Sequence, residues 1–538
     1  MSTPKLNPAL NQQVFDFPNH ESDKYFEVGF NISIEKSISD YIWGKLNTKP
    51  DDVSALGTST PPCAPYVRGE RAAPHAPLDA CLSFRGQLTG LQSKVLKTIL
   101  TYFSIGWLLV PSMMLRAGTA ALFFVFFLII AWRSTILFCG WVIAETQTSP
   151  AVLPVQDKNL PIYCILVPAY REHALMPQIA RAMRALDWPA HRLDILILLE
   201  EDDAETIAAA ETAAFPDGTR ICRVPRIGPR TKPNALNYGL TLAKGEFVTV
   251  YDVEDLPAPN QLRHAYSTFS RSNPNVVCLQ AALIGDNARR NWLSAQWALE
   301  YDIQFRLLLP GLSLYQMPLP LGGTSNHFRK DALLALGGWD AWNVTEDADL
   351  GMRLARASLV AQTFASETYE DAPTQARIWL PQRSRWIKGH IQTWLVLMRD
   401  PRRALQQMGF VAFLSAQFSL GASILAPLFH APCFLFVLAT FLIPGLELGR
   451  AGGFLLGAGL ALGLFSGLAA PGRWSVIRVF AILTQPLYWP LHSCAAYLAI
   501  WELVKDPFFW AKTPHRPRAK ESPEHCSTGS SASASPPA

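Results

Sequence analysis

The sequence predicts an α/β domain with a parallel sheet, set between groups of membrane-spanning helices. Two observations support this prediction. Four short runs rich in Val, Ile and Leu alternate with helical stretches between residues 160 and 282, which is the pattern of parallel strands joined by crossover helices. Long apolar segments flank this region, and 49% of the 538 residues are hydrophobic, which is too apolar for an ordinary soluble enzyme of this size.

Charge and cysteine content exclude two classes of protein. The net charge is only +4, and the Lys and Arg residues are scattered along the chain, so no basic run or aromatic-basic alternation indicates a nucleic-acid binder. Nine cysteines lie far apart without any Cys-x-x-Cys pair, which predicts reduced thiols and neither a disulfide framework nor a zinc site.

The N-terminal region, residues 1–90, is polar and lacks the apolar core of a signal peptide. Residues 25–46 mix aromatic and apolar side chains, whereas residues 47–77 have the composition of a linker. We expect this region to be partly disordered. A regulatory module and a plain leader both remain open.

Two apolar segments follow, at residues 99–115 and 120–132, and the second extends to residue 143 if it includes Arg133. A membrane span needs about 20 apolar residues, so the first segment is near the lower limit and the second reaches full length only by including Arg133. A long side chain such as that of Arg133 can snorkel to the interface. The break at Arg116-Ala117-Gly118 suits the turn of a helical hairpin. We therefore predict a transmembrane hairpin at residues 95–145, which returns the chain to its starting side.

The predicted strands are residues 162–167, 193–199, 246–251 and 276–282, with helices at 175–186 and 234–242 between them. Such short, continuously apolar runs are typical of parallel strands covered by helices on both faces. Ligands bind beyond the carboxyl ends of the strands in sheets of this kind. The residues that directly follow each run are therefore the candidates for a functional site.

Polar motifs stand at these positions. Pro168-Ala169-Tyr170-Arg171-Glu172 follows the first run, and the four acids from Glu200 to Asp203 follow the second. Lys232-Pro-Asn-Ala-Leu-Asn237 opens a predicted helix. Four acids at a strand end can also be a solvated turn, and a lone lysine before a helix can be surface charge. These motifs gain weight only from their order along the chain.

The run at 246–251 ends in Asp252-Val253-Glu254-Asp255. Two carboxylates separated by one residue at a strand end can bind one hard cation, and Mg²⁺ or Mn²⁺ would then bridge to a diphosphate and neutralise the leaving group. Asp252 is the first candidate ligand. Glu254 is the second, with Asp255 adjacent.

Residues 321–390 carry the remaining candidates: Gly322-Gly323-Thr324, then Thr345-Glu346-Asp347, then Gln382-Arg383-Ser384-Arg385-Trp386. A carboxylate base, two guanidinium groups and an indole in one stretch suit sugar transfer from a charged diphosphate donor. Alone, Thr-Glu-Asp is more typical of a helix N-terminus with acids in its first turn. The order and spacing of the three motifs favour the sugar-transfer interpretation over that of a plain helix N-terminus.

Taken together, these motifs resemble the membrane-bound, processive family 2 glycosyltransferases, which include cellulose and hyaluronan synthases. The resemblance implies a GT-A fold, which is Rossmann-like, on the cytoplasmic side of the cell inner membrane in a multi-pass protein.

The same resemblance implies roles for three groups of residues. Donor binding falls to Pro168, Tyr170, Glu172, Glu200, Glu201, Lys232 and Asp252, with Glu200-Glu201 standing where the family has an Asp-Asp pair and Lys232 facing the donor phosphates. Asp252 and Glu254 would bind Mg²⁺ or Mn²⁺, as in the Asp-x-Asp signature. Asp347, beside Glu346, would be the general base, Trp386 would stack on the acceptor sugar, and Gln382, Arg383 and Arg385 would hold the diphosphate and the channel mouth.

An aromatic-rich stretch at residues 287–309 suits either a helix on the membrane surface or a core helix of the domain. Four further span candidates follow, at residues 410–427, 432–446, 453–470 and 476–503. The predicted organisation is therefore a polar region at 1–90, a transmembrane hairpin at 95–145, a glycosyltransferase domain at 155–400, transmembrane helices at 408–504 and a cytoplasmic tail at 505–538 with a disordered end.

The resulting hypothesis is a metal-dependent inverting glycosyltransferase that transfers a sugar from a nucleotide sugar, specifically a UDP-sugar, to a growing polysaccharide. Two alternatives are a non-processive transferase to a lipid-linked acceptor and a non-catalytic membrane scaffold or receptor with the same fold. Expected partners are the nucleotide sugar, a polysaccharide or glycolipid acceptor and membrane lipid, without nucleic acid. Export or regulatory subunits are further candidates.

Overall fold

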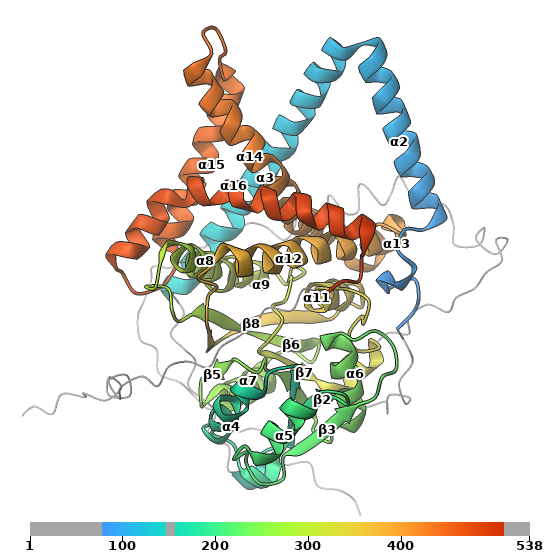
Figure 1. Ribbon diagram of the computed structural model, residues 1–538, viewed down its shortest axis with the longest axis vertical. Helices are drawn as coiled ribbons and strands as arrows, with labels where there is room; N and C mark the ends of the chain where they lie inside the picture. Colours follow the sequence, from blue (N-terminus) through green and yellow to red (C-terminus); the bar gives the residue numbers. More distant parts are fainter. Residues whose placement is uncertain (1–77, 147–156, 511–538) are drawn as a thin grey trace, which may run out of the picture. The chain divides into compact units, whose positions relative to one another are not determined.

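The computed structural model describes residues 78–146 and 157–510, all within one compact unit of the chain. An α/β domain carries the sheet, and Figure 1 shows helices α3 (Pro111–Thr146), α14 (Phe410–Leu442) and α15 (Gly449–Ala469) extending from one side of it. The interpretations of residues 1–77 and of the tail beyond residue 510 concern parts of the chain outside the described residues.

The domain contains one eight-stranded sheet with the order β3-β2-β1-β4-β7-β6-β8-β5. The strands are β1 (Tyr163–Ala169), β2 (Leu193–Glu200), β3 (Arg220–Val224), β4 (Phe247–Val250), β5 (Leu256–Pro257), β6 (Val276–Gly285), β7 (Asn326–Arg329) and β8 (Val360–Glu370). The four predicted strands correspond to β1, β2, β4 and β6. Their apolar side chains are buried on both faces, as expected for strands covered by helices.

The sheet is mixed, which differs from the parallel sheet that the sequence predicts. β1, β2, β3 and β4 form parallel pairs, but β7 runs antiparallel to both of its neighbours, β4 and β6. β7 has only four residues, Asn-His-Phe-Arg, so it lacks the apolar run that marks a strand in sequence. β7 follows the Gly-Gly-Thr loop directly, and this brings the loop to the carboxyl end of β4.

Helices cover both faces of the sheet. They are α4 (Met176–Arg184), α5 (Ala204–Thr212), α6 (Lys232–Leu242), α7 (Gln261–Arg271), α8 (Trp292–Ile303), α9 (Leu309–Leu314), α10 (Lys330–Ala335), α11 (Glu346–Arg356), α12 (Ala376–Leu397) and α13 (Pro401–Met408). One hydrophobic core packs α4 and α7 against the sheet. A second joins α6 and α11 to α8, α12 and α16 (Val476–Lys505). The stretch at 287–309 is therefore a core element of the domain, because most side chains of α8 are buried.

Within the described residues, three helices are long and apolar enough to cross a membrane: Pro111–Ala144, Phe410–Leu442 and Gly449–Ala469. The helix before them, α2 (Gly90–Leu109), meets α3 at Val110. The predicted hairpin turn at residues 116–118 is wrong, since α3 continues through it. Pro111 explains the position of the break, because proline is well tolerated as the first residue of a helix.

The predicted separation of residues 410–427 from 432–446 is also wrong, because both lie in the continuous helix α14. Pro432 lacks an N–H group and would leave the carbonyl of Leu428 without its helical donor. The hydroxyl of Tyr497 in α16 donates to that carbonyl at 2.8 Å. Ser493 accepts from the Ala431 N–H at 2.8 Å and donates to the Pro427 carbonyl. Side chains of α16 thus satisfy the backbone groups that the prolines leave open.

α16 is not among the three span candidates, although the sequence predicts a span there. Figure 1 shows it lying along α12, and it also packs against α14. Its polar side chains bind the domain: Lys388 of α12 donates to Glu502 at 3.0 Å, and Trp292 of α8 donates to Thr484 at 2.8 Å. Polar groups spaced along its length lower its hydropathy and tie it to the domain.

Candidate active site

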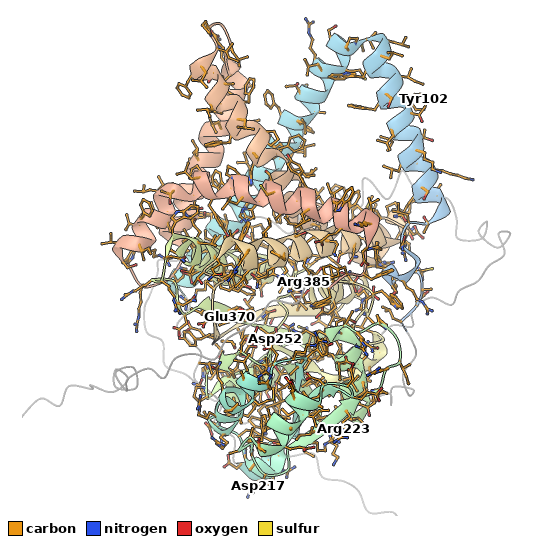
Figure 2. The ribbon with its side chains drawn as sticks, in the orientation of Figure 1. Tyr102, Asp217, Arg223, Asp252, Glu370 and Arg385 are labelled. Atoms are coloured by element: carbon orange, nitrogen blue, oxygen red, sulfur yellow. The ribbon has the colours of Figure 1, made fainter. Side chains whose placement is uncertain are left out.

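A cavity of about 1610 Å³ begins at the carboxyl ends of β1, β2 and β4 and continues between α3, α14, α15 and α16. Figure 2 shows Asp252 and Arg385 in the layer between the sheet and α12. All the residues predicted for the site line this cavity except Glu201. The fold therefore brings together motifs that lie more than 200 residues apart in sequence.

Lys232 stands on the donor side, at the first residue of α6. Its ammonium group donates to the carbonyl of Gly323 at 2.7 Å and forms an ion pair with Asp252. Burial alone would lower the pKa of Lys232, but the charges of Asp252 and Glu346 raise it above its ordinary value. The lysine therefore stays protonated and offers a positive charge to an anionic ligand such as a diphosphate.

The turn after β4 separates the roles of its acids. Asp255 is fully buried and accepts from the Asp252 N–H at 2.7 Å and from the Thr324 hydroxyl. Burial and the charge of Asp252 raise the pKa of Asp255 well above its ordinary value. It is absent from the cavity wall, where Asp252 and Glu254 lie. Asp255 therefore shapes the turn, and Glu254 is the acid that shares the cavity with Asp252.

Asp252 and Glu254 fit a divalent cation in their chemistry, because both offer the carboxylate oxygens that hard cations prefer. Within residues 78–146 and 157–510, no cluster of three or more His, Cys, Asp or Glu side chains is placed to hold a metal ion. Two carboxylates do not complete a coordination shell. The donor diphosphate and water would have to supply the remaining ligands.

The acids after β2 diverge in position. Glu200 lines the cavity, and burial raises its pKa. Glu201 is exposed and pairs with Arg226 at 3.3 Å, while Asp202 pairs with Arg226 and Arg230 at 3.0 and 2.9 Å. Asp203 caps α5. Of the predicted pair, Glu200 alone faces the cavity.

Thr345 is the N-cap residue of α11, and Glu346 and Asp347 lie in its first turn. The Thr-Glu-Asp motif is thus a helix N-terminus, and this N-terminus lines the cavity. Burial and the charge of Asp347 raise the pKa of Glu346 to about 8. Burial likewise raises the pKa of Asp347. A carboxylate that water does not stabilise is a stronger proton acceptor than one in solvent.

Two glycines allow close approach around these acids. A Cβ atom at Gly323 would lie 3.3 Å from Oδ2 of Asp347 and 3.5 Å from Nζ of Lys232. A Cβ atom at Gly389 of α12 would lie only 2.2 Å from Oγ1 of Thr345. The missing side chain of Gly323 therefore leaves open a space that Nζ of Lys232 and Oδ2 of Asp347 both border. Gly389 lets α12 rest directly on the start of α11.

Asn237 is a supporting residue within the motif at the start of α6. Its amide donates to the Trp339 carbonyl at 2.8 Å and accepts from the Trp339 N–H at 2.9 Å. Thr231 donates to the Ala341 carbonyl at 3.0 Å. These bonds fix the loop that leads into α11, so the start of α6 positions both Lys232 and the approach to Asp347.

The two arginines of Gln-x-x-Arg-Trp have different surroundings. Arg383 pairs with Glu300 of α8 at 2.6 Å, and its guanidinium carbon lies 4.5 Å from the ring centroid of Trp386. Arg385 lies over the Trp510 ring at 4.7 Å and donates to the Val344 carbonyl at 3.4 Å. No carboxylate pairs with Arg385 among the residues that the structure describes. Its charge is therefore more available to a ligand than that of Arg383.

Glu300 is a site residue that the sequence analysis misses. Its carboxylate accepts from Arg383, from the Tyr488 hydroxyl at 2.8 Å and bonds His492 at 3.0 Å. Burial alone would raise the pKa of Glu300, but Arg383 and His492 lower it to about 2. The available signal is an acid between Leu299 and Tyr301 in an aromatic helix, since such an acid needs a buried partner.

Comparison with known proteins places the domain in a family. Residues 161–389 match the family described as "Glycosyltransferase like family 2". A β-monoglucosyldiacylglycerol synthase from Trichormus variabilis is 29% identical over 245 residues, which cover 44% of this chain and 50% of the relative. Cellulose synthase 2 from Novacetimonas hansenii is 24% identical over 249 residues, which cover 45% of this chain and 15% of the relative. This chain thus spans half the length or less of these two curated relatives.

Among solved structures, the mannosyltransferase PcManGT from Pyrobaculum calidifontis, in complex with GDP-Man and Mn²⁺, matches with a TM-score of 0.44 and 18% identity. The match covers 71% of this chain and 99% of the mannosyltransferase. The region that matches the family model is the α/β domain with the mixed sheet, and apolar helices flank it. Residues 161–389, which are less than half of the chain, are therefore similar to the family 2 glycosyltransferases.

Proposed function

We propose that this protein is an inverting glycosyltransferase that transfers a sugar from a nucleotide sugar to an acceptor reaching the site from the membrane. The observation that carries the proposal is the arrangement around Gly323, where Nζ of Lys232 and Oδ2 of Asp347 border the same space beside one glycine. Lys232 would hold the donor diphosphate. Asp347 would take the proton of the acceptor hydroxyl, so no covalent intermediate is needed.

The donor we propose is a UDP-sugar, as the motifs imply, with Glu200 on the nucleotide side. Asp252 and Glu254 would bind Mg²⁺ or Mn²⁺, which neutralises the diphosphate as it leaves. Arg385 would hold the same diphosphate, because Arg383 is already engaged by Glu300. A purely scaffolding role is less well supported, since it gives no reason for buried acids of raised pKa around a cavity.

The membrane part of the cavity bears on the choice of acceptor. The sequence favours a growing polysaccharide, but the wall between α3, α14 and α15 is mostly aliphatic and aromatic. A polysaccharide needs hydrogen-bond partners along its path, whereas a lipid chain does not. The second candidate, a lipid-linked acceptor, therefore fits this wall better. It also agrees in kind with the β-monoglucosyldiacylglycerol synthases among the relatives. The proposed location is the cell inner membrane, in a multi-pass arrangement with a cytoplasmic domain.

The test uses the full chain purified in detergent, with Mg²⁺ or Mn²⁺ and a panel of radiolabelled nucleotide sugars. Lipid extract of the expression host supplies acceptors. Label that enters the organic phase supports a lipid-linked acceptor, and label in a high-molecular-weight aqueous product supports a polysaccharide. Release of free sugar by hydrolysis reports donor use without any acceptor. Absence of all three products with every donor would refute the proposal.

A further inference from the structure

One face of α3 lines the membrane part of the cavity for most of its length. Leu115, Leu122, Phe126, Ile129 and Ile130 recur at helical spacing and lead to Arg133. Eighteen residues of α-helix span about 27 Å, which is close to the thickness of the hydrocarbon core of a bilayer. The cavity therefore has an apolar wall about as long as the hydrocarbon core of a bilayer is thick, and the cation Arg133 lies at the end of this wall nearest the α/β domain.

The opposite walls have the same character. α14 contributes Phe434, Phe436 and Val437, and α15 contributes Gly452, Gly459 and Gly463. The glycines leave space where side chains would otherwise fill the crevice. The polar side chains that interrupt the apolar surface include Thr119, Ser423 and His430. These walls suit hydrocarbon.

Arg133 lies where this apolar wall meets the domain. One turn further along α3, Leu137 is fully buried, and Gly140 packs against the backbone of Leu307. A guanidinium group in a membrane helix is costly unless a partner offsets its charge. In the described part of the chain, neither a carboxylate nor a hydrogen-bond acceptor is paired with Arg133. Glu300 attracts it electrostatically, but that carboxylate is already bound by Arg383, Tyr488 and His492.

Two further polar groups on the cavity wall are unsatisfied. Within the described residues, Nδ1 of His430 and Nδ1 of His492 are buried and have no hydrogen-bond partner. His430 interacts electrostatically with both Arg133 and His492. The unpaired guanidinium of Arg133, together with Nδ1 of His430 in the tautomer that carries its proton there, has the composition of a binding site for an anion.

We propose that the crevice between α3, α14 and α15 holds the chain of an acceptor lipid, and that Arg133 binds a phosphate group joining this chain to the acceptor sugar. This inference rests on the proposed glycosyl transfer and names the class of its acceptor. The phosphate lies at Arg133, and the sugar extends past Arg383 and Trp386 toward Asp347. The acceptor hydroxyl oxygen then forms a bond to C1 of the donor sugar, the bond from C1 to the diphosphate breaks, the diphosphate leaves with the electron pair and Asp347 receives the proton.

The test compares two ligands that differ only in the phosphate: tritiated farnesyl phosphate and farnesol. Binding is measured on the full chain in dodecyl maltoside, which contains no phosphate, and without nucleotide sugar. The wild type should bind farnesyl phosphate more tightly than farnesol. Arg133→Gln should weaken farnesyl phosphate binding on the order of 10- to 100-fold, as expected for lost charge-assisted hydrogen bonds, and leave farnesol binding unchanged. The matched control is Arg116→Gln, because Arg116 is exposed on the same helix outside the cavity.

Arg133→Lys keeps the charge and should retain part of the preference for farnesyl phosphate, which shows that any loss in Arg133→Gln is not misfolding. Equal loss of both ligands without rescue by Arg133→Lys would overturn the proposal. So would unchanged binding in Arg133→Gln, or competition by inorganic phosphate as strong as that by farnesyl phosphate. No sugar is transferred in this assay. The binding result therefore tests the lipid phosphate site even if the proposed catalytic function is wrong.

Discussion

Asp347→Asn is the substitution that most directly tests the catalytic arrangement. Oδ1 of Asp347 accepts from the Ala348 N–H at 2.7 Å, and an asparagine oxygen can accept the same bond. The change is nearly isosteric, so the tight approach of Gly323 is preserved. What the variant loses is the ability to take up a proton.

The expected loss follows from that single function. Removal of a general base reduces turnover by a factor on the order of 10² to 10⁴, which is about 2.7 to 5.4 kcal/mol of activation free energy. Donor binding should change little, because Lys232 keeps its ion pair with Asp252 in the variant. We therefore expect a fall in kcat with a nearly constant donor KM.

The assay measures initial rates of label transfer over a range of donor concentrations, with binding of the nucleotide diphosphate measured separately. Wild type and variant are compared in the same detergent, and their unfolding curves serve as the folding control. Full turnover in the variant would remove Asp347 as the base. A large rise in donor KM at constant kcat would instead assign it to donor binding.

The same variant also tests how the free energy of unfolding depends on pH. The pKa of Glu346 is about 8, above its ordinary value of 4.5, so the folded protein holds an extra proton between these pH values. The free energy of unfolding should therefore fall as pH rises through this window. Because the charge of Asp347 contributes to the raised pKa, Asp347→Asn should make that fall shallower. Unfolding measured at pH 5 and pH 8.5 checks this, and identical slopes in both proteins would contradict it.

Three other substitutions test separate parts of the site. Asp252→Ala should raise the Mg²⁺ or Mn²⁺ concentration needed for activity, and an unchanged metal titration would place the cation elsewhere. Gly389→Ala brings a methyl group to 2.2 Å from Thr345, so it should cost about 1–3 kcal/mol of stability by overpacking. Gly421→Ala, with nothing within 4 Å, is its control, and equal stability of the two would refute the packing argument. Trp386→Ala should abolish or shorten the product while donor hydrolysis falls much less. Equal loss of both activities would assign Trp386 to the donor site or the fold.

Much of the fold is predictable because its central strands are continuous apolar runs. β1, β2, β4 and β6 lie within a few residues of their predicted positions. β3 and β7 are not predictable in this way: β3 is an edge strand with charged residues, and β7 is a polar four-residue strand. β7 pairs with β4 and β6 through its backbone, and no side-chain pattern encodes that.

The candidate site shows a similar division. Motifs that directly follow strands, such as Tyr170 and Asp252, could be located from sequence because strand ends gather at one edge of a sheet. Glu200 and Glu201 are identical neighbours, so the sequence alone could not tell which of them faces the cavity. Neighbouring side chains at a strand end point to opposite sides, and only Glu200 lines the cavity. Glu300 was missed because its partners, Arg383, Tyr488 and His492, lie 83 or more residues away in sequence.

The membrane helices show why α16 matters to the site. Local hydropathy predicts two helices from residue 410 to 446 and a span at α16, but Ser493 and Tyr497 of α16 complete the backbone of α14 at its prolines. On another part of the same helix, Tyr488 and His492 hold Glu300, which pairs with Arg383 beside Trp386. α16 therefore contacts both a wall of the membrane crevice and the side of the cavity opposite the donor site. Because these contacts use polar side chains, the features that exclude α16 from the span candidates are the ones that hold Glu300 and, through it, Arg383 beside Trp386.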